Sequence, residues 1–156
     1  MLQAAPELAQ LVQARFEAYG LGLLATLRQD GAPRISGLEP LFALDELWLG
    51  MMLDSLKARD LRRDPRFALH SATTDRQVTD GDARVSGRAI EVDDQATRDR
   101  FREAFQAATG TALPPDPFHL FHADVDEIML LRPGGDHLNI DVWRSNRDGT
   151  RRIERF

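Results

Sequence analysis

The sequence predicts a mainly β protein in which an antiparallel sheet closes into a small barrel flanked by helices. Short apolar runs of strand length recur along the chain, and tight turns such as Asp30-Gly31, a dipeptide typical of hairpins, join them. The series holds six or so strands with polar edges, and closing such a sheet removes its exposed edges. The length of 156 residues fits one domain, so residues 1–156 are expected to form a single unit.

The first helix and the strands are recognised by the spacing of their apolar residues. Within residues 5–19, Leu8, Leu11 and Phe16 recur at helical spacing, and Gly20 ends the helix. The barrel is expected over about residues 21–155, with strands at Leu23–Arg28, Arg34–Phe42, Leu47–Leu53, Arg66–Ser71, Ala83–Val92, Phe118–Leu131, Leu138–Trp143 and Arg151–Arg155.

Two further helices and one bend complete the expected order. Asp54-Ser55 caps a short helix, Leu56–Arg63, which Asp64-Pro65 stops. Asp93–Thr109 has an apolar face at helical spacing. Pro40 cannot donate to a β-ladder, so the strand that contains it is expected to bend or to lie at an edge. Loops are expected at residues 72–82 and 110–117.

Composition and charge exclude several classes of protein. The net charge of −5 is opposite to that of a typical nucleic-acid binder, so we expect no nucleic-acid partner. No apolar run approaches the roughly 20 residues that span a bilayer, and the first residues lack the pattern of a secretion signal. The absence of cysteine excludes disulfides, thiolate metal sites and thiol nucleophiles. Together these features predict a cytoplasmic protein without a membrane partner.

Lys57 stands out because it is the single lysine among 20 basic residues. It falls in the first turn of the helix that Asp54-Ser55 caps, where free N–H groups and the helix dipole favour an anion such as a phosphate. A cation is disfavoured at that end of a helix, and an anionic ligand would resolve the conflict. The alternative is a plain capped surface helix with a solvated lysine, and the residues alone leave both open.

Three blocks of sequence, residues 25–36, 55–69 and 81–89, give the chain a family resemblance. They read ATLRQDGAPRIS, SLKARDLRRDPRFAL and GDARVSGRA. In this order they resemble the pyridoxamine 5′-phosphate oxidase-like FMN-binding split-barrel superfamily, and within it the flavin and deazaflavin (F-420) oxidoreductase branch. The resemblance implies a six-stranded antiparallel split β-barrel that forms a homodimer, with FMN or F-420 in a groove at the dimer interface.

The resemblance also assigns cofactor-binding residues. Ser55 and Lys57 match the Ser-Arg-Lys that binds the cofactor phosphate in the family, with Leu56 in place of the arginine. The strand that contains Arg34 would face the flavin, and Arg84 would reach the cofactor from the partner subunit. The full set of expected cofactor-binding residues is Arg34, Ile35, Ser36, Gly37, Met51, Met52, Ser55, Lys57 and Arg84.

Two further positions depart from the family pattern, and the one near the C-terminus argues against pyridoxamine phosphate oxidation itself. The oxidase has an Arg-Xaa-His motif near its C-terminus, and this chain has Gly135-Asp136-His137. Glu39 stands where the oxidase has a second lysine. We therefore expect hydride transfer between FMN or F-420 and another small organic substrate. The alternatives are a non-catalytic protein that binds a flavin, haem or tetrapyrrole, and a split barrel that has lost its ligand.

Catalytic and metal-binding residues are not assigned. The cofactor carries the chemistry in such sites, so few side chains act as acids or bases. His119 and His122 could form a metal pair on a helix, but on the expected strand they point to opposite faces. Trp48 and Trp143 are expected in the core or at the dimer interface, with stacking near the flavin as the alternative.

Overall fold

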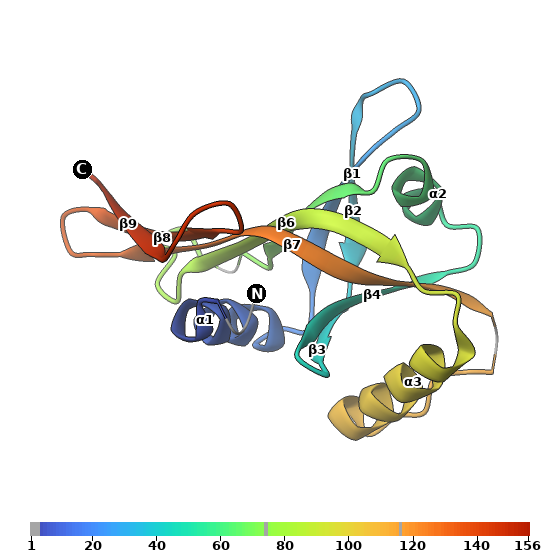
Figure 1. Cartoon of the computed structure of the whole chain (residues 1–156). Helices are drawn as coiled ribbons and strands as arrows, with labels where there is room; N and C mark the ends of the chain where they lie inside the picture. Colours follow the sequence, from blue (N-terminus) through green and yellow to red (C-terminus); the bar gives the residue numbers. More distant parts are fainter. Residues whose placement is uncertain (1–3, 74, 116) are drawn as a thin grey trace.

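The computed structural model describes residues 4–73, 75–115 and 117–156 and contains an antiparallel sheet with three helices (Figure 1). Thr74 and Asp116, which fall in the two expected loops, lie outside the described residues. The elements are α1 (Pro6–Glu17), β1 (Gly22–Leu27), β2 (Pro33–Leu38), β3 (Pro40–Ala43), β4 (Glu46–Met52), α2 (Leu56–Arg63), β5 (Arg66–Ser71), β6 (Asp82–Glu91), α3 (Gln95–Thr109), β7 (Phe118–Pro133), β8 (Leu138–Arg144) and β9 (Thr150–Arg155).

The order of the strands explains how the sheet closes. Neighbours run β2-β1-β5-β6-β7-β4-β3, and the β8–β9 hairpin extends the sheet from the second half of β7. β2 and β3 therefore lie at opposite ends of this order, yet Glu39 alone separates them in sequence. The chain joins the two ends of the sheet through this bend. β3 pairs only with residues 46–49 of β4, so the rest of β4 has no partner from β3, and the barrel has a seam between β2 and this end of β4. This arrangement is the expected split barrel.

The strand expected at residues 34–42 is divided at Glu39 into two strands with different neighbours. β2 pairs with β1, whereas β3 pairs with β4. Pro40, the first residue of β3, has no N–H group with which to continue the first ladder. This division and the β8–β9 hairpin explain why the described residues form nine strands rather than the six implied by the resemblance.

The interior of the barrel is built from one continuous row of apolar side chains across five strands. Leu24 pairs with Leu69, Leu69 with Val85, Val85 with Ile128, and Ile128 with Trp143, and all five are buried. Burial of each large apolar side chain contributes about 1.5–3 kcal/mol. A slip of one residue would turn these side chains to solvent, so the row specifies the register.

The helix α1 covers one side of this interior. Its buried residues Leu8, Val12 and Phe16 form the apolar stripe seen in the sequence, and the helix lies against β6 and β7 (Figure 1). Phe16 also packs against Phe42 of β3, with the ring centroids 5.6 Å apart. This helix thereby brings the β3 end of the sheet together with its centre.

A second, smaller core lies on the outer face of β4 and β7, beneath α3. Trp48 packs there against Phe101 of α3, with ring centroids 5.6 Å apart, and Leu120 of β7 completes the cluster. Both Trp48 and Trp143 are buried, which confirms their expected place in the core.

In the described part of the chain, no helix combines the length and the apolarity needed to cross a bilayer.

Candidate functional site

A hollow of about 260 Å³ opens along the seam between β2 and β4. Its lining residues come from both strands, from the bend after β2, from the loop before β1 and from α2: Leu21, Gly37, Leu38, Glu39, Gly50, Met51, Met52 and Lys57. Lys57 links α2 to β2, because its Nζ donates a hydrogen bond of 2.7 Å to the carbonyl oxygen of Gly37. β2 is the last strand on its side of the sheet, so this carbonyl lies on an edge that lacks a neighbouring strand.

Burial lowers the pKa of Lys57 from its ordinary value, since the half-buried ammonium loses part of its hydration. An ammonium group has three N–H donors, and the bond to Gly37 uses one of them. Two donors are therefore left for an anion in the hollow. The position combines a fixed positive charge with donors that can still form bonds.

The start of α2 adds backbone donors beside this lysine. Ser55 caps the helix, and its Oγ accepts from the N–H of Ala58 at 3.4 Å. The first N–H groups of a helix have no partner within the helix, and the dipole gives that end a partial positive charge. The first turn holds Lys57 and Arg59 but no acidic residue. The electrostatic conflict seen in the sequence is therefore present in the folded chain, and a bound anion would relieve it.

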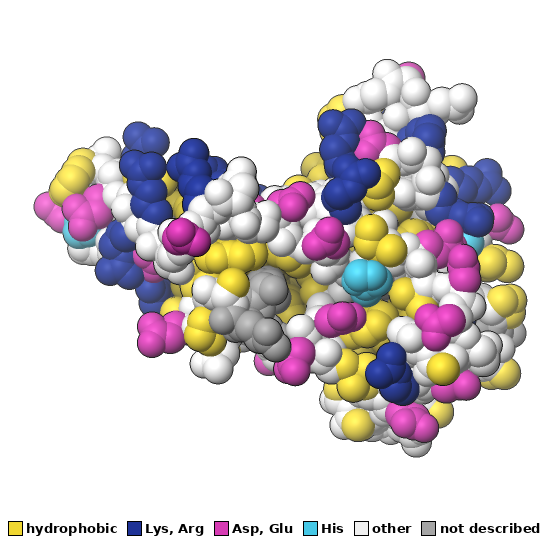
Figure 2. All heavy atoms as spheres, in the orientation of Figure 1, with side chains coloured by type: hydrophobic (Ala, Val, Ile, Leu, Met, Phe, Trp, Pro, Cys, Tyr) yellow, Lys and Arg dark blue, Asp and Glu magenta, His cyan; other side chains and the backbone are white. Residues whose placement is uncertain are grey.

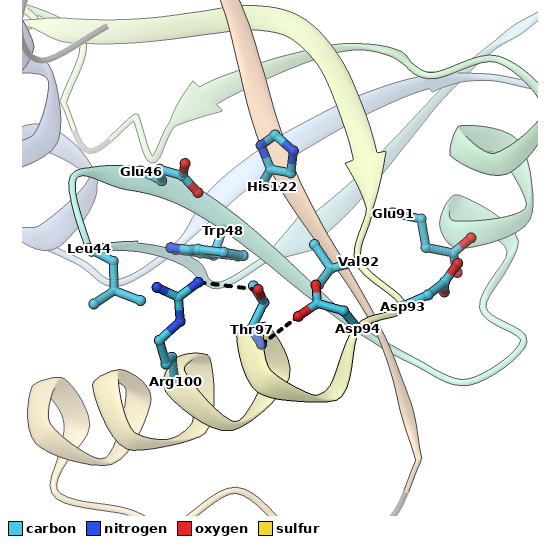
Figure 3. A pocket seen from close by; sticks show the side chains of 10 residues that line it. All are labelled: Leu44, Glu46, Trp48, Glu91, Val92, Asp93, Asp94, Thr97, Arg100 and His122. Carbon is cyan, nitrogen blue, oxygen red and sulfur yellow. Dashed lines mark hydrogen bonds between the residues drawn. The ribbon is translucent and has the colours of Figure 1, made fainter.

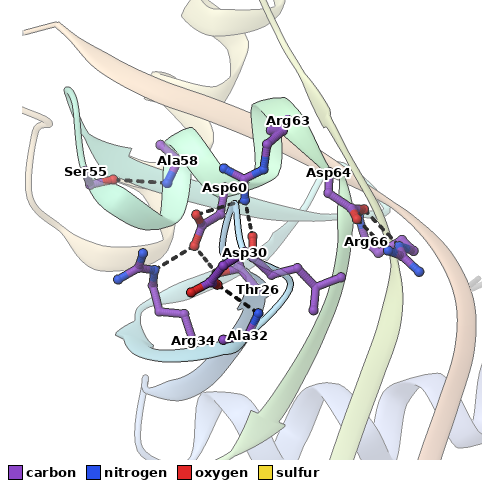
Figure 4. A network of polar contacts seen from close by, with 11 residues as sticks. Thr26, Asp30, Ala32, Arg34, Ser55, Ala58, Asp60, Arg63, Asp64 and Arg66 are labelled. Carbon is purple, nitrogen blue, oxygen red and sulfur yellow. Dashed lines mark hydrogen bonds and ion pairs between the residues drawn. The ribbon is translucent and has the colours of Figure 1, made fainter.

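A buried carboxylate holds α2 against the β1–β2 hairpin (Figure 4). The Asp60 side chain is 4% exposed. Its Oδ2 accepts from Thr26 Oγ1 at 2.9 Å and from Arg34 Nε at 2.6 Å, and its Oδ1 accepts from Arg63 at 3.2 Å. Arg63 also donates to the carbonyl of Leu27. These contacts tie one helix to two strands and thereby set the position of Lys57 opposite β2.

The pKa of Asp60 results from opposing effects. Burial by itself raises the pKa, but the hydrogen bonds from Arg34, Thr26 and Arg63, together with the charge of Arg34, outweigh it, and the pKa lies below its ordinary value. Asp60 is therefore ionised in the folded chain at neutral pH.

Four of the expected cofactor-binding residues line the hollow, and a fifth lies beside it. Gly37, Met51, Met52 and Lys57 are in its lining, while Ser55 begins α2 next to it. The two methionines differ in their exposure, 4% for Met51 and 80% for Met52, because neighbours in a strand point to opposite faces. Of the two, Met52 exposes its side chain at the hollow, whereas the side chain of Met51 belongs to the core.

The remaining expected residues lie elsewhere. The Arg34 guanidinium is engaged with Asp60. Ile35 is 70% exposed on the outer face of β2, and Ser36 points inward beside Leu24. Arg84, on β6, donates to Glu127 at 2.9 Å. Within one chain, two strands separate β6 from β2, so the fold does not bring Arg84 to the hollow.

Sequence reasoning missed Asp60, which has the largest structural role near the site. The one local signal is an acid three residues after Lys57 on the helix face that also carries Ala58 and Leu61, both buried. Its partners Thr26 and Arg34 are 34 and 26 residues away, so no periodic pattern marks them.

A second hollow, of about 360 Å³, lies between the β3–β4 turn and the start of α3 (Figure 3). None of the expected cofactor-binding residues is among its lining residues, which are Leu44, Glu46, Trp48, Glu91, Val92, Asp93, Asp94, Thr97, Arg100 and His122. Four of these are acids, against one arginine and one histidine. The charge balance is unfavourable for a phosphate, so the seam is the better candidate for an anionic cofactor.

The two histidines of β7 face opposite sides of the sheet. His122 lies beside Trp48 at a ring distance of 6.3 Å, whereas His119 Nδ1 is 2.9 Å from Glu91 Oε1. Across residues 4–73, 75–115 and 117–156, no group of three or more His, Cys, Asp and Glu side chains could hold a metal ion.

Basic side chains gather on the arm formed by β8 and β9, at the left of Figure 2. In two places, a pair of arginines donates hydrogen bonds to the same acidic side chain. Glu127 accepts from Arg84 and Arg144, and Asp141 accepts from Arg132 and Arg152. Arg84 is thus part of an ion-pair network that reaches this arm.

Comparisons with known proteins agree on the fold. The family model described as pyridoxamine 5′-phosphate oxidase matches residues 8–132. The structure of PhzG from Burkholderia lata 383 in complex with tetrahydrophenazine-1-carboxylic acid aligns with a TM-score of 0.71 and 16% identity, over 97% of this chain and 92% of that chain. A pyridoxamine 5′-phosphate oxidase-related, FMN-binding protein from Nostoc punctiforme PCC 73102 aligns with a TM-score of 0.66 and 19% identity, over 96% of this chain and 95% of that chain.

A haem-binding protein from Mycobacterium smegmatis aligns with a TM-score of 0.59 and 24% identity, over 86% of this chain and 57% of that chain. A search of curated protein sequences finds no match. At these identities the structural likeness concerns the fold alone.

Asp60→Asn is expected to lower the free energy of unfolding by about 3 kcal/mol, because the variant breaks a buried ion pair. The loss should lie near the lower end of the range for such pairs, since the Arg34 partner partly reaches solvent. The depressed pKa makes the stabilisation by Asp60 complete above its unfolded-state pKa of about 4. The stabilisation is lost as pH falls through the folded-state pKa, so the variant should show a flatter acid limb. Urea unfolding between pH 2 and 7 measures both effects. Asp99→Asn, which changes an exposed acid on α3, is the control. If the free energy of unfolding of Asp60→Asn equals that of the wild type, the structural role assigned to Asp60 is contradicted.

Proposed function

The chain belongs to the pyridoxamine 5′-phosphate oxidase family, and from that membership we propose that it is an oxidoreductase that binds FMN or coenzyme F-420. In this proposal, a hydride passes between the bound cofactor and a small organic substrate. The observation that carries the proposal is the contact between Lys57 and Gly37, which joins the anion-favouring start of α2 to the hollow at the seam.

The donors around the hollow suit a phosphate group. Lys57 has two N–H donors beyond its bond to Gly37, and the Ser55 hydroxyl and the first N–H groups of α2 lie next to it. Leu56 is exposed where the family often has an arginine, so this chain has one cation fewer than the family pattern. The phosphate would rest on one lysine and on backbone donors, and Lys57 should therefore account for much of the affinity.

The β2 wall of the hollow suits a flat ring. A Cβ atom added to Gly37 would have no other atom within 4 Å, so the space beside this glycine is open and a ring could lie against the backbone. The exposed side chains of Leu21 and Met52 offer apolar surface on either side. Isoalloxazine and deazaflavin rings are flat and largely apolar, and their ribityl phosphate would extend toward α2.

The residues of the chain would bind and orient rather than react. When bound, FMN or F-420 would supply the hydride-transfer chemistry. Lys57 would hold the phosphate, Gly37 would allow close approach of the ring, and Met52 and Leu21 would keep water from one side of it. The FMN binding of the Nostoc protein supports a flavin, and the choice between FMN and F-420 stays part of the proposal.

The outer face of the sheet supports a homodimer with the cofactor at its interface. A row of paired residues runs from Gly37 through Leu23 and His70 to Arg84 on this face. Leu23 and Ile35 are exposed there, and Met52 is exposed at the seam. Apolar side chains so close to the hollow fit a surface that a second copy would cover. In such a dimer, the partner's face could bring an arginine to the cofactor.

Lys57→Ala is expected to weaken binding of the preferred phosphate-bearing cofactor at least tenfold, about 1.4 kcal/mol, because the charge and two donors are lost. Fluorescence or calorimetric titration with FMN and with F-420, each separately, measures this change. Arg155→Ala removes an equal charge from the exposed end of β9, away from the hollow, and should change the affinity less than twofold. Equal losses in the two variants would show that only net charge matters.

Ile35→Asp is expected to shift the protein from dimer to monomer, because it introduces a charge into the proposed interface. Sedimentation velocity over a range of concentrations measures the mass. Leu138→Asp, at an exposed apolar position on β8, is the matched control and should leave the dimer intact. A wild-type protein that is monomeric at all concentrations would contradict the homodimer.

Non-catalytic binding of a flavin, haem or other tetrapyrrole is the second candidate function. It is favoured by Leu56 in place of arginine and by the haem-binding structure among those of like fold. Multiple turnover of the cofactor-loaded protein with an artificial electron acceptor separates the two. We expect turnover at many times the rate of free cofactor, whereas tight binding without such an increase would favour storage or sensing.

A further inference from the structure

His119 lies on β7 directly beside the loop that precedes α2. Its side chain is 11% exposed, and its two ring nitrogens have different neighbours. Nδ1 is 2.9 Å from Glu91 Oε1, and Nε2 accepts from the backbone N–H of Asp54 at 3.4 Å. The hydroxyl and backbone donors proposed to bind phosphate begin at the next residue, Ser55.

The hydrogen bonds determine which nitrogen carries the proton. Asp54 N–H is a donor, so Nε2 must present its lone pair. The proton of the neutral ring then lies on Nδ1, which donates to the carboxylate of Glu91. The second oxygen of Glu91 is 2.9 Å from Nε of Arg62, in the last turn of α2. Contacts thus run from the end of α2 through Glu91 and His119 back to the residue that precedes its cap.

The residue that His119 contacts has an unfavourable backbone conformation. Asp54 has φ of +59°, in the left-handed region, which most residues other than glycine, asparagine and aspartate avoid. Such a conformation persists when the surroundings hold it. The N–H group of Ser55 bonds to the carbonyl of Met52, so the loop turns tightly between β4 and α2. A change at Asp54 would therefore reorient the capping hydroxyl and the first turn of the helix.

We propose that His119, held by Glu91 in the Nδ1-protonated form, is a positioning residue for the anion site at the start of α2. By accepting from Asp54 N–H, it maintains the left-handed turn that directs Ser55 and the following N–H groups at the phosphate of the cofactor. This role rests on the proposed function, because it assumes that a phosphate binds there. It predicts that His119 contributes to affinity for the phosphate and not for the ring.

The test compares ligands that differ by that phosphate. FMN and riboflavin are titrated into wild type, His119→Phe and His119→Gln; if the wild type prefers F-420, that cofactor and its phosphate-free chromophore replace them. His119→Phe is expected to weaken binding of the phosphate-bearing ligand at least fivefold and of the phosphate-free ligand less than twofold. His119→Gln, which retains an acceptor, should recover most of the loss. His122→Phe, on the opposite face of the same strand, is the matched control.

Amide hydrogen exchange at Asp54, measured without ligand, separates the possible failures. Faster exchange at Asp54 in His119→Phe, together with the selective loss, would support the proposal. Equal weakening for both ligands would indicate general damage to the fold and would overturn it, as would unchanged FMN or F-420 affinity despite faster exchange. A wild type that binds neither cofactor would instead overturn the proposed function, and this inference with it, whatever the exchange at Asp54.

Discussion

The geometry of the seam depends on the hydrogen bonds that the buried carboxylate of Asp60 accepts from the β1–β2 hairpin. A buried charge that loses its partners costs several kcal/mol, so Thr26 and Arg34 have to stay within hydrogen-bond distance of it. This requirement keeps α2 docked on the β1–β2 hairpin. Lys57 lies one turn earlier on the same helix, and its contact with Gly37 follows from that docking. The anion-favouring end of α2 is therefore placed by a side chain that need not touch any ligand.

The split in the barrel has two consequences for the chain. It leaves β2 with an open edge, which in other sheets invites pairing with a second chain. Here Lys57 contacts one carbonyl of this edge, and Glu39 and Pro40 turn the chain away from it. The same opening creates the hollow beside Gly37 and Met52. A feature that would weaken an ordinary sheet thus provides the space that the proposed cofactor requires.

Local patterns in the sequence predicted most of the fold, because strands and helices depend on near neighbours. The apolar runs at Leu23–Arg28 and Ala83–Val92 predicted two of the barrel strands, and Pro40 predicted the bend. The site was less accessible, because it depends on contacts between distant segments. Arg34 was expected at the cofactor, yet it pairs with an acid 26 residues away. Strand alternation makes Met51 and Met52 differ in exposure, but which of the two faces the core depends on how β4 packs in the sheet, and no local pattern specifies that.

A titration of ¹⁵N-labelled protein with FMN and with F-420, followed by amide chemical shifts, tests the location of the proposed site most directly. We expect one cofactor to cause its largest shifts at Gly37, Met52 and Lys57, with smaller shifts along the outer face of β1. Largest shifts instead at Trp48 and Thr97 would place the ligand in the hollow between the β3–β4 turn and the start of α3, and would contradict a site at the seam. The absence of shifts with either cofactor would contradict the oxidoreductase proposal itself.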